Sequence, residues 1–236
     1  MKKLWVIVIS VFFLTILLNA DYLIKTKMHM DAFEMMGQKQ PATDEMVENW
    51  IGKDRMLTHQ QEKIFIVRMD LKKMYYVMSK TKSFIEINLP FDFSSLLPPE
   101  AVQMMSMMKM TLQVTPTKNT KMINKWNCQE YIVEMKMAMG SYTMNMWVTQ
   151  DIKINLDAYA EMYTNVTAMG FIENADEYKK IKGYPIHVDM NMNMMGMNIK
   201  GFNTVIEITE KTPPKGLYSP PAGFQKKEKL GMQDFR

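Results

Sequence analysis

Methionine side chains alternate along the stretch Tyr131–Thr149 of this chain, so a β-hairpin there would carry its thioethers on one face. The 236-residue sequence contains 29 methionines. Because the thioether is flexible and polarisable, a sheet lined with it suits irregular apolar partners such as acyl chains. Thioethers also bind Cu(I), so soft-metal binding is a second chemistry open to the same residues.

The first hairpin is predicted to turn at Gly140-Ser141, because glycine readily adopts the positive φ of a type II′ turn. Its cross-strand pairs would be Met139–Tyr142, Met137–Met144, Met135–Met146 and Val133–Val148. A second alternating stretch, Pro185–Thr209, is predicted to turn near Met195-Gly196. Its apolar phase shifts near Gly201–Asn203, which predicts a bulge before Val205–Thr209. The ligand-lining residues that we predict from the two hairpins are Met135, Met137, Met139, Met144, Met146, Met190, Met192 and Met194.

Two interpretations of this methionine face remain open. It lines a ligand cavity, or it is the filled core of the sheet, since apolar periodicity reports burial alone. The copper alternative lacks support from other ligands, because the first hairpin contains no histidine or cysteine within Tyr131–Thr149. In Met28-His29-Met30 the imidazole points to the opposite face from both sulfur atoms, so this triplet cannot chelate on a flat strand.

No catalytic motif accompanies the methionines. The sequence has no GxSxG, P-loop or GxGxxG pattern, and His29, His59 and His187 lack metal-ligand spacing. We therefore predict a non-enzymatic protein without a cofactor or a metal site. The formal net charge of +4 is too small to indicate nucleic-acid binding.

The N-terminus has the pattern of an export signal. Lys2 and Lys3 precede the apolar run Leu4–Leu18, and Ala20 is a candidate cleavage residue. We expect residues 1–20 to be a signal peptide and residues 21–236 to be one domain in the periplasm or cell envelope. Cys128 is the only cysteine, so the exported chain would have no internal disulfide.

Short β-branched and aromatic runs separated by polar turns indicate strands along most of the chain. Tyr22–Phe33 alternates as a half-buried strand, and Ile64–Arg68, Met74–Met78 and Ser83–Asn88 are spaced as an antiparallel meander. A short strand is expected near Leu112–Thr115, and the polar stretch Thr117–Asn127 is expected to lead from it into the first hairpin.

Two helices are predicted among these strands. Pro99–Met110 begins with proline in its first turn, and Asp157–Met169 carries apolar residues at helical spacing and ends at Gly170. The Pro- and Lys-rich tail after Thr209 is expected to form an edge segment or an extended cover.

The ordered motifs "WIGKDRM", "CQEYIVEMKM", "GYPIHVDMNMNMMG" and "LYSPPAGFQK" resemble a family of exported bacterial domains of unknown function. That family is grouped with the LolA-like lipoprotein-carrier superfamily. The resemblance extends over Tyr22–Lys226. It implies a strongly curved antiparallel sheet, a half-barrel, whose helices cover the concave face. Better-known members of the superfamily carry acyl chains or lipoproteins in the concave cavity.

We therefore expect an α+β, LolA-like domain with about eight to eleven strands and two helices over its concave face. The expected function is to bind or carry a lipid or acylated ligand in a methionine-lined cavity, with Pro99–Met110 as a lid. The expected partners are a lipid or lipoprotein and a protein of the envelope, and no nucleic acid. The alternatives are Cu(I) binding and a structural or interaction domain without a small ligand.

Overall fold

The computed structural model describes residues 20–35, 37–89, 110–137, 140–154, 159, 172–194 and 197–229. Its strands are β1 (Asp21–Met30), β2 (Phe33–Met35), β3 (Gln38–Gln40), β4 (Thr43–Ile51), β5 (Arg55–Gln60), β6 (Lys63–Arg68), β7 (Lys73–Met78), β8 (Ser83–Asn88), β9 (Met110–Ile123), β10 (Trp126–Met137), β11 (Gly140–Thr149), β12 (Tyr184–Met194), β13 (Met197–Lys211) and β14 (Gln225–Lys227). Two short 3-10 helices, η2 (Met69–Leu71) and η4 (Ala175–Lys180), complete the described elements.

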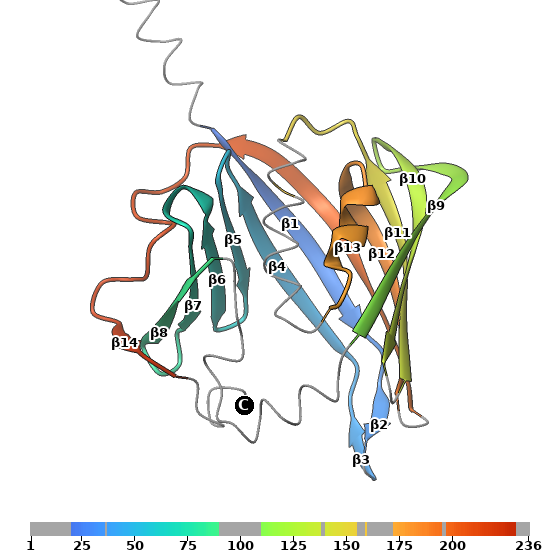
Figure 1. Ribbon diagram of the computed structural model, residues 1–236, viewed down its shortest axis with the longest axis horizontal. Coiled ribbons are helices and arrows are strands. Elements are labelled where there is room, and N and C mark those ends of the chain that lie inside the picture. The colour runs from blue at the N-terminus through green and yellow to red at the C-terminus, as the bar shows by residue number, and fades with distance from the viewer. Residues whose placement is uncertain are drawn as a thin grey trace, which may run out of the picture.

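Twelve of these strands form one sheet in the order β14-β8-β7-β6-β5-β4-β1-β13-β12-β11-β10-β9. Neighbouring strands are antiparallel except β14, which runs parallel to β8. The sheet curves strongly, so that β6–β8 face β9–β12 across a concave side (Figure 1). The separate pair β2–β3 extends the β1–β4 hairpin beyond the sheet.

The predicted meander is confirmed. Its three runs are β6, β7 and β8, which pair consecutively through Ile66↔Tyr75 and Tyr75↔Glu86. Strand β5 adds a further antiparallel neighbour, with Leu57 opposite Ile66. Each run is bounded by polar residues that form the turn, and each is rich in β-branched or aromatic residues, which fit a pleated surface. Local patterning was therefore sufficient to place these strands.

The predicted α+β class is wrong. The described regular structure is almost entirely strand, and no pair of helices covers the concave face within the described residues. Residues 99–109 of the first predicted helix and all but Tyr159 of the second lie outside the described residues, and Met110 begins strand β9. The short strand expected near Leu112–Thr115 is part of β9, and the polar stretch Thr117–Asn127, for which the sequence predicts no strand, belongs to the β9–β10 hairpin. An exposed strand is stabilised by hydrogen bonds to its partner strand and does not require an apolar pattern. A polar sequence therefore gives no local signal that it will form a strand.

The predicted register of the first methionine hairpin is also wrong. In the structure Met135 faces Tyr142 and Val133 faces Met144, so Gly140 is the first residue of β11 and not part of the turn. The inward face is nevertheless the predicted one. The partner of each residue is shifted by four positions, from Met146 to Tyr142 for Met135. A shift by an even number leaves every side chain on its original face, so the alternating pattern could not distinguish the two registers.

The second methionine hairpin has the predicted tip, because Met194 pairs with Met197. A bulge was expected near Gly201–Asn203. The irregularity lies instead against Lys25 and Thr26 of β1, where Ile206 is skipped in the pairing with β13. The extra residue points outward: Ile206 is 52% exposed.

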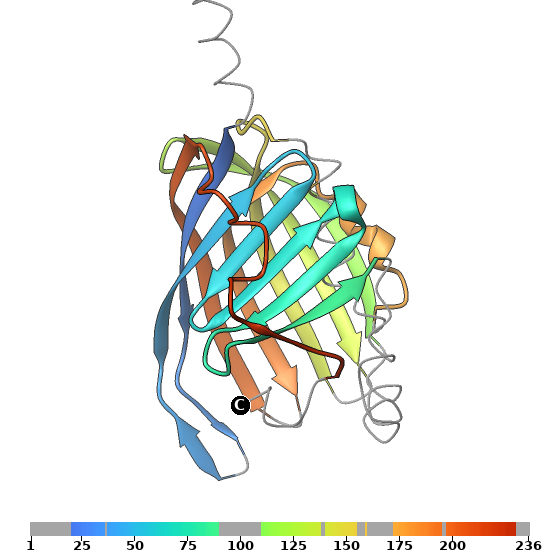
Figure 2. The same ribbon diagram turned by 90° about the vertical axis from the view of Figure 1, so that its left-hand side faces the viewer.

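The C-terminal tail covers the outer face of the sheet beside β4–β8, as expected (Figure 2). Tyr218 packs there with Leu23, Trp50 and Leu57 in a cluster separate from the inner core. The tail then ends as β14 on the edge of β8. The other edge, β9, is partly covered because the Asn174 amide pairs with the backbone of β9.

A buried acid holds the tail to the start of β1. Asp21 is 4% exposed, and the Tyr218 hydroxyl donates to its Oδ2 at 2.7 Å. The Arg55 guanidinium lies 3.2 Å from the same carboxylate and 4.7 Å from the centre of the Tyr218 ring. Burial and the adjacent Asp21 raise the pKa of the Tyr218 hydroxyl, so it stays protonated and remains a donor.

The predicted signal segment lies outside the described residues except for Ala20. No helix in the described ranges has the length and apolar content to cross a bilayer.

We predict that Tyr218→Phe lowers the free energy of unfolding by about 1–3 kcal/mol, because it leaves a buried carboxylate without its hydroxyl donor. The measurement is the urea unfolding midpoint followed by tryptophan fluorescence. Tyr22→Phe is the matched control, because the Tyr22 hydroxyl donates to Glu210 in a more solvated position. Equal losses in the two variants would contradict the assigned role of Tyr218.

Candidate functional site

An apolar cavity of about 370 Å³ lies on the concave side of the sheet. Its described lining comes from both halves of the sheet and from the strands between them. The lining residues are Thr26, Val47, Asn49, Ile51, Met56, Thr58, Phe65, Tyr142, Met144, Met146, Tyr159, Tyr184, Pro185, Ile186, Val188, Met190, Asn203 and Val205. The cavity therefore depends on sheet curvature, which brings strands distant in sequence to face one another.

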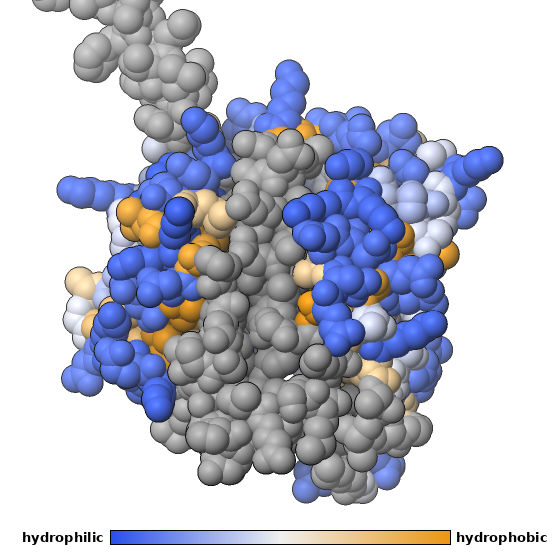
Figure 3. Space-filling view, viewed as in Figure 1, coloured by the Kyte–Doolittle hydropathy of each residue, from blue (hydrophilic) through white to orange (hydrophobic). Residues whose placement is uncertain are grey.

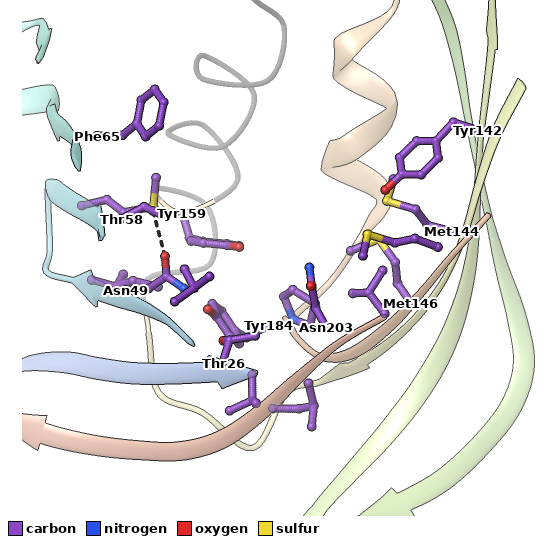
Figure 4. Close-up of a pocket in the computed structure, with 18 residues that line it drawn as sticks. Thr26, Asn49, Thr58, Phe65, Tyr142, Met144, Met146, Tyr159, Tyr184 and Asn203 are labelled. Carbon is purple, nitrogen blue, oxygen red and sulfur yellow. Dashed lines mark hydrogen bonds between the residues drawn. The ribbon is translucent and has the colours of Figure 1, made fainter. Parts of the chain in front are cut away.

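The two sides of the cavity differ in chemistry. Figure 4 shows Tyr142, Met144 and Met146 on one side and Phe65 and Thr58 on the other. Strand alternation places the methionines inward, since Met144 and Met146 are two residues apart on β11 and Met190 faces Met144 from β12. In the whole-molecule view, apolar side chains reach the surface toward the middle and hydrophilic side chains cover the flanks (Figure 3).

Three of the eight predicted methionines, Met144, Met146 and Met190, line this cavity. Met135 is 8% exposed and packs into the core beside Leu112. Met137 and Met192 are half-buried and are not among the lining residues. All of Met139 and the side chain of Met194 lie outside the described part of the structure. The methionine face thus lines a cavity at one end and fills a core at the other.

The predicted site residues did not include a line of polar side chains across the cavity floor. We call Asn203, Thr26, Asn49 and Thr58 the polar stripe. They lie on the neighbouring strands β13, β1, β4 and β5. Asn203 is opposite Met28, two residues beyond Thr26, and Asn49 is opposite Ile24, two residues before it. The available sequence signal was a polar residue at an inward strand position, as Thr26 is within Tyr22–Phe33.

Hydrogen bonds orient one end of the polar stripe and leave the other end open. The Thr58 hydroxyl donates to Asn49 Oδ1 at 2.7 Å across the β4–β5 pair. At the other end, Asn203 Oδ1 is buried and has no hydrogen-bond partner among the described residues. Figure 4 shows the Asn203 side chain directed into the cavity. A buried acceptor without a partner is costly, so this atom is suited to a ligand donor.

The histidines lie away from the cavity, on the outer face. His29 Nδ1 is 3.1 Å from Asp44, and His187 Nε2 is 3.1 Å from Asp189. His59 Nε2 bonds the backbone oxygen of Gln61 at 2.9 Å. Within the described ranges, no group of three or more His, Cys, Asp or Glu side chains is arranged to hold a metal ion.

Cys128 is buried in the inner core and is 1% exposed. Burial raises the pKa of its thiol, and the negative charge of Asp151 raises it further. A protonated, inaccessible thiol is a poor nucleophile, so Cys128 acts as a small core residue.

These features define a protein class, a strongly curved and mainly antiparallel sheet with an apolar cavity on its concave side. The chain belongs to the family described as domain of unknown function DUF4412, whose model matches residues 22–224. The expectation of a domain family without an assigned function is thereby confirmed. Placement in the LolA-like superfamily remains a prediction. No curated protein matches the chain.

Two solved structures are similar at low identity. PNGF-II shares 9% identity over 88% of this chain, with a TM-score of 0.42, and the aligned part is 31% of PNGF-II. A DUF1329 family protein from Desulfovibrio piger shares 10% identity over 90% of this chain and 95% of its own, with a TM-score of 0.35. The chain therefore spans less than a third of PNGF-II, and neither likeness carries an argument about function.

We predict that Cys128 in the folded protein reacts with a disulfide reagent at least about a hundredfold slower than in denaturant, because its thiol is buried and protonated. The measurement is the rate of colour release from dithiobis-nitrobenzoate. Met122→Cys supplies the control, since Met122 is 63% exposed and the added thiol should react at once. Rapid native labelling of Cys128 would refute its place in the core.

Proposed function

We propose that the protein is a non-enzymatic binding or carrier protein for a lipid or acylated ligand at the cell envelope, in the manner of the LolA-like superfamily. The observation that carries this proposal is the apolar cavity of about 370 Å³ on the concave face of the sheet. This volume falls within the range of roughly 300–1,000 Å³ that is usual for small-molecule sites.

The chemistry of the cavity wall supports an alkyl ligand. Transfer of apolar groups from water is worth about 0.8 kcal/mol for each methylene, so an alkyl chain supplies its own driving force. Met144, Met146 and Met190 present flexible thioethers that can follow an irregular chain. Phe65 and Val188 bound the same space with apolar surface.

The absence of charge from the described lining favours binding over catalysis. None of the described lining residues is Asp, Glu, His, Lys, Arg or Cys. General acid–base catalysis ordinarily uses such side chains, positioned within hydrogen-bond reach of the reacting atom.

The proposed location at the cell envelope rests on the N-terminal sequence, in which Lys2 and Lys3 precede the apolar run Leu4–Leu18 as in an export signal.

We predict that Met190→Trp weakens binding of the neutral apolar probe N-phenyl-1-naphthylamine by at least about tenfold, because the indole ring occupies cavity volume. The measurement is a fluorescence titration, with circular dichroism to establish that each variant is folded. Met122→Trp is the control, since it adds the same ring at an exposed position of β9. Failure of the unmodified protein to bind the probe would refute the carrier proposal.

We also predict that protein purified gently from its own envelope fraction carries a heterogeneous adduct of lipid-like mass. Native mass spectrometry detects it, and denaturation should release it because no covalent link is involved. The same spectrum reports whether residues 1–20 have been removed. A discrete copper-mass adduct would favour the soft-metal alternative. A bare chain that takes up neither lipid nor Cu(I) would indicate an interaction domain.

A further inference from the structure

The proposed ligand has a polar end, and the cavity contains specific groups to receive it. The polar stripe runs over four adjacent strands, with Asn49 directly opposite Thr58 and with Thr26 diagonal to both Asn49 and Asn203. Val188 of β12 lies directly opposite Asn203, and the methionines lie beyond it on β11 and β12. A bound amphiphile can therefore place its alkyl part on the methionine side and its polar end on the stripe.

The open end of the stripe requires a hydrogen-bond donor. Asn203 Oδ1 is buried without a partner among the described residues, and as a carbonyl oxygen it can only accept. Thr26 lies on the neighbouring strand and contributes a hydroxyl that can both donate and accept. A ligand hydroxyl or amide N–H is the group that satisfies Asn203. A carboxylate or phosphate oxygen would face the carbonyl oxygen with like partial charge.

The electrostatics of the cavity oppose an anionic ligand. The described lining contains no Lys, Arg or His to pair with a negative headgroup, and burying an unpaired charge is strongly unfavourable. The same face of β4 carries the acid Glu45, two residues before the lining residue Val47. Its carboxylate already accepts from Gln60 Nε2 at 2.8 Å and from the Gln61 amide. That end of the concave face therefore adds negative charge.

We propose that the cavity selects neutral amphiphiles whose polar end carries a hydroxyl or amide donor, and that it discriminates against anionic lipids of the same chain length. This inference rests on the proposed carrier function and adds the class of ligand. Asn203 and Thr26 are its specificity-determining residues.

Oleamide, methyl oleate and oleate share the same oleoyl chain and differ only at the polar end. Comparing them separates the effect of the ligand's charge from the effect of its hydrogen-bond donors. Each is titrated against protein loaded with N-phenyl-1-naphthylamine at neutral pH, and its dissociation constant is obtained from probe displacement. Oleamide is neutral and has N–H donors, methyl oleate is neutral without a donor, and oleate is anionic. We expect oleamide to bind about tenfold more tightly than methyl oleate, and oleate to bind most weakly.

Asn203→Leu tests the acceptor at similar side-chain volume. It should lower oleamide affinity about tenfold and leave methyl oleate unchanged, so the preference between them disappears. Asn191→Leu is the matched control, because Asn191 on the adjacent strand β12 also has a buried Oδ1 without a described partner but is not among the cavity-lining residues. Thr26→Val is nearly isosteric and tests the polar stripe independently if Asn203→Leu does not fold. It should lower the affinity for oleamide more than the affinity for methyl oleate.

The outcomes distinguish this inference from the function on which it rests. If the probe binds but oleate binds as tightly as oleamide, the carrier function stands and the selection of neutral ligands is refuted. Loss of the preference in Asn191→Leu as well as in Asn203→Leu would also overturn the role assigned to Asn203. If neither the probe nor any of the three ligands binds, the carrier function itself fails.

Discussion

Strand β1 joins the two halves of this protein, and the concave cavity depends on its pairing. It is hydrogen-bonded along its length to β13 on one side and to β4 on the other. The β4–β8 meander and the β9–β13 strands are otherwise separate runs of the chain. Because antiparallel strands twist in one sense, a sheet of twelve strands curls, and its two ends come to face each other across β1. The inward residues of β1, Ile24 and Thr26, thereby become the floor between two walls.

The outer face of the same sheet is stabilised by different means. A curved sheet exposes apolar side chains on its convex side unless another element covers them, and here the C-terminal tail does so over β4–β8. The buried carboxylate of Asp21, beneath this tail, is tolerated because the Arg55 guanidinium compensates its charge and the Tyr218 hydroxyl donates a hydrogen bond to it. The tail therefore covers the outer face of β4–β8, and none of its described residues lines the cavity.

The inner face combines two requirements that oppose each other. Stability favours filling the sheet with side chains, and β9–β11 do so around Met135 and Val133. The proposed binding function requires space, and Met144, Met146 and Met190 border the cavity. Methionine suits both roles because its unbranched chain fills a gap or yields to a ligand at low cost. A polar stripe whose buried acceptor, Asn203 Oδ1, has no hydrogen-bond partner among the described residues would be a defect in an ordinary core, and this is why we propose a role in recognition for it.

The sequence by itself determined which side chains share a face on β1 and on the two methionine hairpins, the β6–β8 meander, the tip of the second hairpin and the covering role of the tail. These follow from side-chain alternation and from turn residues, which act over a few positions. It did not determine the register of β10 and β11, since a four-residue shift of the partner strand preserves the pattern. Nor did it determine the class of the fold, since a polar run such as residues 117–123 of β9 is a strand because it pairs with β10. The polar stripe joins residues 26, 49, 58 and 203, and no local pattern relates them. Only tertiary pairing through β1 decided that these residues are neighbours, because cross-strand contacts depend on register and curvature and not on separation along the chain.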